Sequence, residues 1–292
     1  MKSLKDNLED FYLKNKSLLE TFYPGLTFPH LTREFLIFSQ TLCDFDEKIF
    51  STPFCSLKKI DIERFYTSLI QGIPLQQISG KAYFYRSEFV VNKEVLIPRP
   101  ESEILVSMAV DFAKKNHIQS VLDIGTGSGC LIISLLRELD FPVAAWAVDL
   151  SSEALLVSQR NAFRLRFSFH PQTKLQFLKS DLTTNLPKNL SFSLVISNPP
   201  YIKESQKNQV HYTVDKFEPK LALYLTDLEY QNWYIRFFCE VKNILGPDGI
   251  LLMEGHEDNL PELQKLARQA GLNEVELFTD YTGRWRFLQA KN

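Results

Sequence analysis

A short apolar segment that runs directly into a glycine-rich turn most constrains the fold of this chain. Residues 120–124 (Ser-Val-Leu-Asp-Ile) have the composition of a buried strand, and residues 130–136 continue as an apolar helix. The turn between them consists of Gly125, Thr126, Gly127, Ser128 and Gly129. Glycine lets the backbone turn tightly and approach a ligand, and the following helix presents free N–H groups. This strand–turn–helix order predicts an α/β fold with a parallel sheet.

Such a turn can bind a dinucleotide or S-adenosylmethionine. Asp123 stands inside the strand before the glycines, where a carboxylate would attract an ammonium group and repel a pyrophosphate. The Gly-x-Gly-x-Gly spacing also differs from the dinucleotide fingerprint. Both details favour S-adenosylmethionine, with a dinucleotide site as the competing interpretation.

A second predicted strand also ends at an acidic residue. Residues 143–148 are apolar, and Asp149 follows them, twenty residues after Gly129. Related folds place a carboxylate at this point on the ribose hydroxyls, so we expect Asp149 to bind the ribose, and its neighbour Leu150 to belong to the cofactor site. The alternative is that Asp149 caps the helix that begins near residues 151–153.

The third predicted strand, residues 175–178, leads into a polar turn. Asp181 is expected there to accept a hydrogen bond from the adenine amine, and Leu182 to pack on the adenine ring. A solvated turn aspartate is the competing interpretation of Asp181.

The fourth predicted strand, residues 192–196, ends in Ser-Asn-Pro-Pro-Tyr. Two prolines stop strand pairing, so the backbone forms a stiff shelf at a strand end, where open α/β sheets bind ligands. The side chain of Asn198 and the carbonyl of Pro199 supply two acceptors. Pro200 holds the turn, and Tyr201 adds an aromatic face. This set suits a planar group with an NH2, a carboxamide or a base amine; a proline turn with a packing tyrosine is the structural alternative.

The first third of the chain predicts a small helical bundle. Hydrophobic residues recur at near-helical spacing in residues 4–22; Thr32 is expected to cap a second helix, and Asp61 to start a third. Residues 1–97 contain 12 Lys or Arg and 12 Asp or Glu, a net charge of zero. Such a bundle is either a structural cap or a protein-docking module.

Two aromatic and β-branched runs, residues 82–85 and 89–91, predict a β-hairpin, with residues 86–88 between the strands. We therefore divide the chain into a helical domain (1–80), a hairpin linker (81–98) and a catalytic α/β domain (99–292). The rest of that domain is expected to contain a helix, a strand, a second helix and an antiparallel strand pair at 227–245, 249–253, 260–270, 274–278 and 285–289.

Arg99 lies between Pro98 and Pro100, in a stiff turn that leads into a helix. Its guanidinium is expected to face a ligand carboxylate or one of the glutamates that follow, Glu101 and Glu103. A structural role in the first helical turn is the alternative for the two glutamates, because it suits the helix dipole.

Composition limits the possible partners and compartment. The formal net charge is −2, so no overall basic field favours nucleic acid or an anionic membrane. The four cysteines are scattered without metal-ligand or disulfide spacing, and the first residues lack an apolar signal core. No apolar run is long enough to span a membrane. We expect a cytoplasmic protein without a metal.

These motifs together resemble class I methyltransferases and, more narrowly, the release-factor glutamine methyltransferases. The glycine turn, the two strand-end aspartates and the proline shelf occur in that family's order. The narrower resemblance is carried by Pro74-Leu75-Gln76 with Gly80, Pro98-Arg99-Pro100-Glu101 with Glu103, Glu218-Pro219 with Ala222-Leu223, and Asp280 with Gly283 and Arg286. It begins around residue 73, and the preceding residues match only as a helical domain of similar size.

The resemblance implies a Rossmann-like methyltransferase sheet joined by the hairpin to a helical release-factor-binding domain. It implies methyl transfer from S-adenosylmethionine, with S-adenosylhomocysteine as product, to the glutamine side-chain nitrogen of the Gly-Gly-Gln motif in class I peptide chain release factors. Residues 198–201 would be catalytic and would bind substrate together with Arg99. The implied cofactor-binding residues are Asp123, Gly125, Thr126, Gly127, Ser128, Gly129, Asp149, Leu150, Asp181, Leu182 and Asn198.

Two segments depart from the family pattern. Residues 254–257 read Glu-Gly-His-Glu where the family usually has a Glu-Ile-Gly-x-x-Gln-like segment. Leu182 stands where a tryptophan often follows the Ser-Asp pair, which would weaken stacking on the adenine and keep an apolar surface.

Two other functions compete. A nucleic-acid methyltransferase could use the same shelf for an exocyclic base amine, although no basic recognition segment is present. A binding protein that has lost catalysis is the third reading, disfavoured by the intact Asn198 and Asp149. No His, Asp or Glu adjoins the shelf in sequence as an obvious base, so the proton is expected to leave to water.

Overall fold

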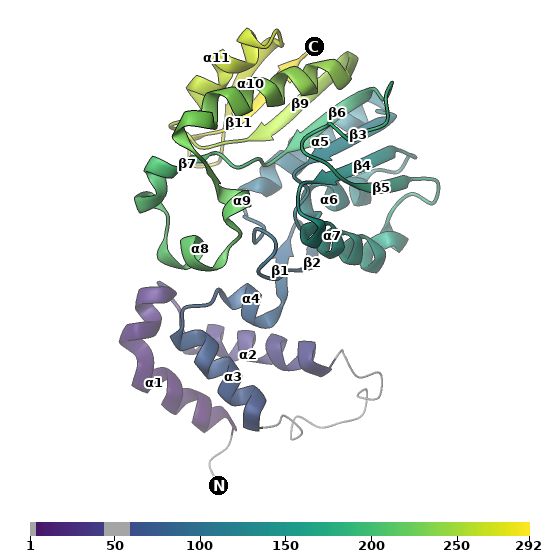
Figure 1. The fold of residues 1–292 in the computed structure, drawn as a ribbon. Helices are drawn as coiled ribbons and strands as arrows, with labels where there is room; N and C mark the ends of the chain where they lie inside the picture. Colours follow the sequence, from purple (N-terminus) through teal and green to yellow (C-terminus); the bar gives the residue numbers. More distant parts are fainter. Residues whose placement is uncertain (1–3, 44–58) are drawn as a thin grey trace.

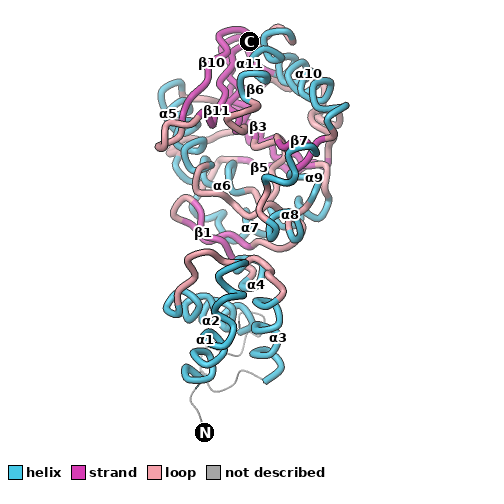
Figure 2. The backbone as a smooth tube through the Cα atoms, turned by 90° about the vertical axis from the view of Figure 1, so that its left-hand side faces the viewer, coloured by secondary structure: helices cyan, strands magenta, loops and turns pink. Residues whose placement is uncertain are grey.

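The computed structural model describes residues 4–43 and 59–292. Helices from the N-terminal part occupy one end of the molecule, and a larger α/β domain occupies the other (Figures 1 and 2). The N-terminal layer contains α1 (Leu4–Phe22), α2 (Phe28–Cys43), α3 (Lys59–Ile70) and α4 (Leu75–Ser79). These helices bury a separate apolar core that includes Leu8, Leu31, Phe35, Phe65 and Leu69. The helical bundle expected from the periodicity is confirmed.

The expected starts of the second and third helices are wrong. α2 begins at Phe28, so Thr32 lies inside the helix, where its hydroxyl donates to the Phe28 carbonyl (2.9 Å) instead of capping. α3 begins at Lys59, ahead of Asp61. A threonine inside a helix can satisfy its hydroxyl on the preceding turn, which makes it an ambiguous signal for a helix start.

A β-hairpin joins the helical layer to the α/β domain, as expected. β1 (Lys81–Phe84) pairs antiparallel with β2 (Ser87–Val90). The two residues between them, Tyr85 and Arg86, both have positive φ (43° and 61°), the conformation that matches the twist of a tight hairpin. Residues 87 and 88 thus belong to the second strand, not to the turn.

The α/β domain is built on a 7-stranded sheet of order β10-β11-β9-β6-β3-β4-β5. The strands are β3 (Ser120–Ile124), β4 (Ala144–Asp149), β5 (Lys174–Lys179), β6 (Phe192–Ser197), β9 (Leu245–Glu254), β10 (Asn273–Thr279) and β11 (Trp285–Lys291). β3, β4, β5, β6 and β9 are parallel, and β11 is antiparallel to both of its neighbours. This order agrees with the expected Rossmann-like class.

Helices cover both faces of this sheet because its strands alternate between two apolar cores. Val121 and Leu194 face one core, and their neighbours Leu122 and Val195 face the other. The first core contains residues of α5 (Ser102–Asn116), α6 (Cys130–Glu138) and α7 (Ser152–Leu165, followed by the 3-10 turn η2, Arg166–Ser168). The second contains residues of α10 (Asp227–Ile244) and α11 (Leu260–Gln269). Sheet alternation therefore produces the three layers visible in Figure 1.

Residues 202–225, which we call the insertion, leave the sheet after β6 and return at α10. They form β7 (Ile202–Lys203), the 3-10 helix η3 (Glu204–Gln209), α8 (Tyr212–Phe217), α9 (Lys220–Leu223) and β8 (Tyr224–Leu225). Figure 1 shows α8 above the N-terminal helices. Phe22 and Tyr212 stack there with ring centroids 6.0 Å apart, and Gln77 Nε2 donates to the Phe217 carbonyl (3.0 Å). The insertion thus connects the helical layer with the sheet.

None of the helices within the described ranges is both long and apolar enough to cross a bilayer.

Candidate functional site

The candidate site is a pocket of about 350 Å³ at the carboxyl ends of β3, β4 and β6. β3 pairs on one side with β4, the next long strand in the chain, and on the other side with β6. Such a reversal of strand order opens a crevice at the strand ends. One side of the pocket is formed by residues 125–128, 149–150 and 180–182, which we call the cofactor wall; Gly129 is not part of the lining. The opposite side includes residues 197–200 and part of the insertion. We call residues 197–201 the acceptor shelf.

Backbone hydrogen bonds fix the glycine turn of the cofactor wall to β4. Gly125 N and Thr126 N both donate to the Val148 carbonyl (2.9 and 3.0 Å). Gly125, Gly127 and Gly129 have φ values of 73°, 54° and 79°, where a side chain is strained. A Cβ on Gly129 would lie 2.8 Å from the Ile133 side chain, whereas one on Gly125 would meet nothing within 4 Å. The first glycine therefore leaves open space, and the third permits close helix packing.

Asp149 holds the turn from the end of β4. Its Oδ2 accepts from Gly127 N (2.8 Å) and its Oδ1 from Ser151 N (2.9 Å). The helix cap of α7 is Ser151, whose hydroxyl accepts from Ala154 N (3.1 Å), so Asp149 is not the capping residue. Burial raises the pKa of the Asp149 carboxyl, and its backbone donors oppose that shift. Leu150 is exposed beside it at the pocket edge.

Asp123 lies behind the glycine turn and does not line the pocket. Its side chain is 0% exposed, and its Oδ2 accepts from the Thr126 hydroxyl (2.8 Å). Its Oδ1 has no hydrogen-bond partner among the described residues. Burial raises the pKa of this carboxyl to about 7, because desolvation disfavours the charge. Asp123 supports the pocket through Thr126, and direct contact with an ammonium group stays a prediction.

The structure places Asp181 differently from its expected role. Its two carboxylate oxygens accept from the guanidinium of Arg236 on α10 (2.6 and 2.9 Å). Asp181 and Leu182 both line the pocket, and Leu182 is buried with a φ of 50°. Trp233 from α10 lines the same pocket and supplies an aromatic surface that the sequence analysis missed.

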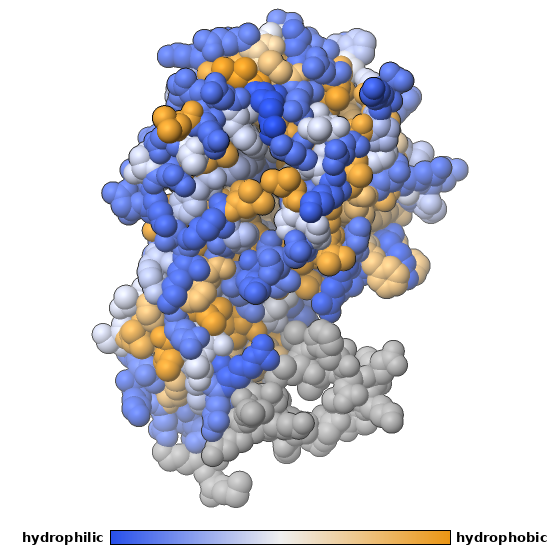
Figure 3. All heavy atoms as spheres, in the orientation of Figure 1, coloured by the Kyte–Doolittle hydropathy of each residue, from blue (hydrophilic) through white to orange (hydrophobic). Residues whose placement is uncertain are grey.

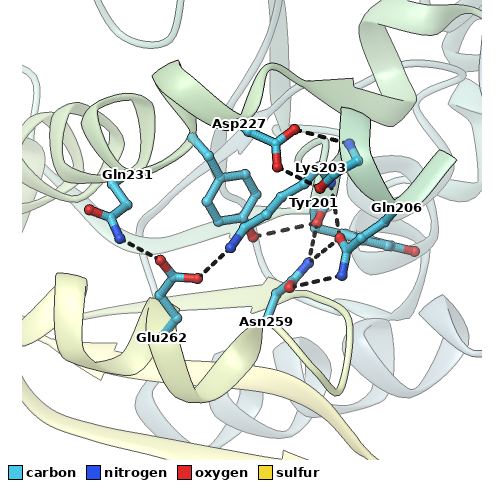
Figure 4. Close-up of polar contacts among 9 residues, drawn as sticks. Tyr201, Lys203, Gln206, Asp227, Gln231, Asn259 and Glu262 are labelled. Atoms are coloured by element: carbon cyan, nitrogen blue, oxygen red, sulfur yellow. Dashed lines mark hydrogen bonds and ion pairs between the residues drawn. The ribbon is translucent and has the colours of Figure 1, made fainter.

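A side chain of α10 and one from the residue before α11 (Asn259) hold the acceptor shelf from behind. Tyr234 Oη donates to the Pro200 carbonyl (3.1 Å), and Asn259 Nδ2 donates to the Tyr201 carbonyl (2.7 Å; Figure 4). No hydrogen bond within the described residues reaches Asn198 Oδ1 or the Pro199 carbonyl. The shelf is thus a rigid support with two free acceptors on the pocket side.

Tyr201 itself does not line the pocket, unlike the three residues before it. Its ring centroid lies 6.5 Å from that of His256, and burial raises the pKa of its phenol well above the usual value. Figure 4 shows how Gln206 and Asn259 surround its backbone. The packing of Tyr201 on a substrate amide stays a prediction.

An acid lies behind the shelf, although the sequence suggested none. Asn198 Nδ2 donates to Ser102 Oγ (3.2 Å), and Ser102 Oγ donates to Glu254 Oε2 (2.5 Å). Ser102 lines the pocket and Glu254 does not. A usable signal existed, since Glu254 ends an apolar strand just as Asp149 does. Ser102 carried no local signal.

Arg99 is paired with a glutamate other than the two considered from sequence. Its guanidinium donates to Glu218 Oε1 (2.6 Å), and Glu218 Oε2 accepts from Ile97 N (3.0 Å). Glu218 is buried, and Arg99 is partly exposed on the pocket wall. The pair therefore binds the insertion to the segment before α5.

Apolar side chains lie among hydrophilic ones near the middle of the face shown in Figure 3. Leu150 and Leu221, both exposed, line the pocket. Among the described residues no cluster of three or more His, Cys, Asp or Glu side chains can hold a metal.

Comparison with known proteins places this geometry in context. The family model of the methyltransferase small domain matches residues 101–220. A release factor glutamine methyltransferase of Koribacter versatilis is 36% identical, over 77% of this chain and 79% of that protein. One of Bacteroides thetaiotaomicron is 33% identical, over 80% and 81%.

Solved structures share the fold at lower identity. The catalytic domain of hMettl16 with a MAT2A 3′UTR hairpin has a TM-score of 0.52 at 16% identity, covering 70% of this chain and 74% of that chain. The T. thermophilus 16S rRNA N2 G1207 methyltransferase with AdoMet and guanosine has a TM-score of 0.51 at 16% identity, covering 73% and 49%.

Proposed function

The chain belongs to the release factor glutamine methyltransferase family, and we propose that it methylates the Gly-Gly-Gln glutamine of class I peptide chain release factors, supporting translation termination. The methyl donor is S-adenosylmethionine and the acceptor is the side-chain amide nitrogen. The pair of free acceptors on the shelf, Asn198 Oδ1 and the Pro199 carbonyl, carries this proposal.

The residues present fit the cofactor. The glycine turn leaves open space at Gly125, and a buried carboxylate oxygen of Asp123, without a partner in the described part of the chain, lies behind it. Asp149 would hold the ribose, and Leu182 with Trp233 would enclose the adenine. When bound, S-adenosylmethionine supplies a sulfonium methyl group and leaves as S-adenosylhomocysteine. The remaining cofactor-binding residues are the turn residues, Leu150, Asp181 and Asn198.

The shelf orients the acceptor. A carboxamide nitrogen is a poor nucleophile, because its lone pair is shared with the carbonyl, so alignment must supply much of the rate. Asn198 Oδ1 and the Pro199 carbonyl each accept one amide hydrogen and place negative dipoles where positive charge develops. The nitrogen gains the methyl group and loses one hydrogen as a proton to water.

Pro200 and Tyr201 complete the proposed substrate site. Pro200 fixes the backbone so that the Pro199 carbonyl keeps its direction, and Tyr201 packs on the amide plane. Arg99 contributes to the substrate site through Glu218, because this ion pair holds the insertion beside the pocket.

The release factor is proposed to dock on the helical domain (1–80) and the insertion, with residues 81–98 as linker and 99–292 as catalytic domain. The contacts Phe22–Tyr212 and Gln77–Phe217 support this arrangement, because they hold the helical domain and the insertion side by side.

A labelling experiment tests the function. The purified chain and labelled S-adenosylmethionine are offered a class I release factor, the same factor with its Gly-Gly-Gln glutamine replaced by alanine, and ribosomal RNA. We expect label on the first substrate alone. Label on the alanine factor or on RNA, or on none of the three, contradicts the assignment.

A further inference from the structure

Three segments far apart in the chain meet behind the acceptor shelf through a line of hydrogen bonds. Asn198 follows β6, Ser102 begins α5, and Glu254 ends β9. Asn198 Nδ2 donates to Ser102 Oγ (3.2 Å), and Ser102 Oγ donates to Glu254 Oε2 (2.5 Å). Ser102 and Glu254 are only 2% and 1% exposed, so water does not compete for these bonds.

The direction of these bonds follows from what each group can do. An ionised carboxylate only accepts, so Glu254 takes the single hydroxyl hydrogen of Ser102. The Ser102 oxygen can then only accept from Asn198, which must present its NH2 to the serine. Its carbonyl oxygen is left for the pocket.

The two ends of an asparagine amide are nearly identical in shape, so packing alone does not choose between them. An inverted Asn198 would present its own NH2 to the NH2 of the substrate. Two donors would then face each other, and one of the two acceptors of the shelf would be lost.

We propose that Ser102 and Glu254 are positioning residues that fix the orientation of the Asn198 amide and so keep its oxygen toward the acceptor nitrogen. This inference rests on the proposed function and extends it to two residues that do not hold the acceptor themselves.

The two hydrogen bonds from Asn198 to Ser102 and from Ser102 to Glu254 form what we call the relay. The charge of Glu254 sets the direction in which these bonds are donated. The charged and titratable groups that act on it come from several elements: Arg286 of β11, Arg99 and Glu101 before α5, Tyr201 of the shelf, and Cys130 of α6. Burial raises its pKa to about 7, against the opposing effects of the Ser102 hydroxyl, Arg286 and Arg99. A protonated Glu254 can donate to Ser102, which frees the serine hydrogen to turn toward Asn198.

The relay therefore predicts a pH profile. The turnover number should fall as pH drops below about 7, in parallel with protonation of Glu254. In Glu254→Gln this inflection should disappear, and the turnover number at pH 8 should be about tenfold lower than in the wild type, since a glutamine can also donate to Ser102. A Glu254→Gln enzyme with the wild-type profile and rate would overturn the proposal.

Substitutions at Ser102 test whether its hydroxyl is needed to orient the Asn198 amide. Ser102→Ala should lower the turnover number on the release factor about tenfold, with the KM for S-adenosylmethionine unchanged, and Ser102→Thr should restore most of it by returning a hydroxyl. Ser134→Ala is the matched control, because Ser134 is a buried serine whose hydroxyl has no partner among the described residues. Wild-type turnover in Ser102→Ala overturns the relay.

A double-mutant cycle separates positioning from general support of the fold. In an Asn198→Ala background, Ser102→Ala should cause no further loss of turnover, because the amide that it orients is gone. A further tenfold loss there contradicts a positioning role. If Ser102→Ala does not fold, Glu254→Gln and its pH profile decide instead.

A spectroscopic readout separates this proposal from the proposed function. The side-chain NH2 signal of Asn198, assigned by its absence in Asn198→Ala, should shift in Ser102→Ala and Glu254→Gln and stay unchanged in Ser134→Ala. An unchanged signal in the first two variants overturns the relay, whatever substrate the enzyme takes. A wild-type enzyme that fails on the release factor while the signal shifts overturns only the assigned substrate.

Discussion

The glycine turn of the cofactor wall and the acceptor shelf differ in how far apart in the chain their supporting parts lie. The glycine turn is held by the backbone of β4 and by Asp149, the strand and residue that follow it in the chain. The shelf is held by side chains of Ser102, Tyr234 and Asn259, from three separate helices or their ends. The glycine turn is therefore held by the next strand of the chain, whereas the shelf depends on side chains from distant segments.

The two regions also differ in their electrostatics. Behind the wall lies a fully buried carboxylate, Asp123, with one oxygen unpaired among the described residues and a pKa raised to about 7. The shelf presents neutral carbonyl oxygens, and the buried acid behind it, Glu254, accepts a hydrogen bond from Ser102. A cationic ligand suits the first arrangement, and a neutral NH2 group suits the second.

The largest expected effect is on the shelf. Asn198→Ala removes one acceptor of the substrate amide, and we expect the turnover number to fall about 100- to 1,000-fold, as for loss of one preorganised polar group. Affinity for S-adenosylhomocysteine, measured by calorimetry, should change less than about threefold, since all the other cofactor-binding residues are intact. Equal losses of turnover and cofactor binding would mean that Asn198 is merely structural.

Asp123→Asn tests the electrostatic difference between the two regions by its effect on the free energy of unfolding. The folded state binds the Asp123 proton more tightly than the unfolded state, so this carboxyl stabilises the fold at low pH, and that stability is lost as pH rises from about 4 to about 7. At pH 8, Asp123→Asn should therefore raise the free energy of unfolding of the ligand-free protein, by on the order of 2 kcal/mol.

Urea unfolding at pH 8 and pH 4 measures this change, which should be small at pH 4. Asp111→Asn on the exposed surface of α5 is the control. A variant that is less stable than the wild type at pH 8 contradicts the raised pKa.

Asp149 and Asp181, the two aspartates of the wall, should contribute unequally to cofactor affinity. Asp149→Asn loses charge beside Gly127 N and Ser151 N, and we expect affinity for S-adenosylhomocysteine to fall about 30-fold. Asp181→Asn should cost only about threefold, because Arg236 already occupies the Asp181 carboxylate. Calorimetric titration measures both, and equal losses would show that Asp181 contacts the adenine in spite of Arg236.

A matched pair of glycines gives the smallest expected effect. Gly125 (φ 73°) and Gly283 (φ 81°) share a left-handed conformation with open space around the missing Cβ. Alanine at either position should destabilise the fold by about 1 kcal/mol, measured by thermal unfolding. Only Gly125→Ala should weaken binding of S-adenosylhomocysteine, about tenfold, because only Gly125 lines the pocket. Equal affinities of the Gly125→Ala and Gly283→Ala variants for S-adenosylhomocysteine would place the cofactor away from the glycine turn.

Sequence reasoning worked best where a motif and its partner are neighbours in the chain. The strand–glycine–helix unit, the hairpin and the antiparallel pair at the end of the sheet all follow from local patterns, and all are present. It was weaker at Thr32, whose hydroxyl bonds inside α2. It also did not foresee the helices of the insertion, whose short apolar runs lack a clear period.

The sequence by itself determined the class of the sheet, the position of the glycine turn and the presence of a proline-fixed shelf, because glycine and proline act on the backbone at their own positions. The tertiary structure alone decided that Arg99 pairs with Glu218, that Asp181 pairs with Arg236, and that Ser102 and Glu254 meet behind Asn198. These contacts join segments far apart in the chain. They depend on strand register and helix rotation, which local residue patterns do not specify.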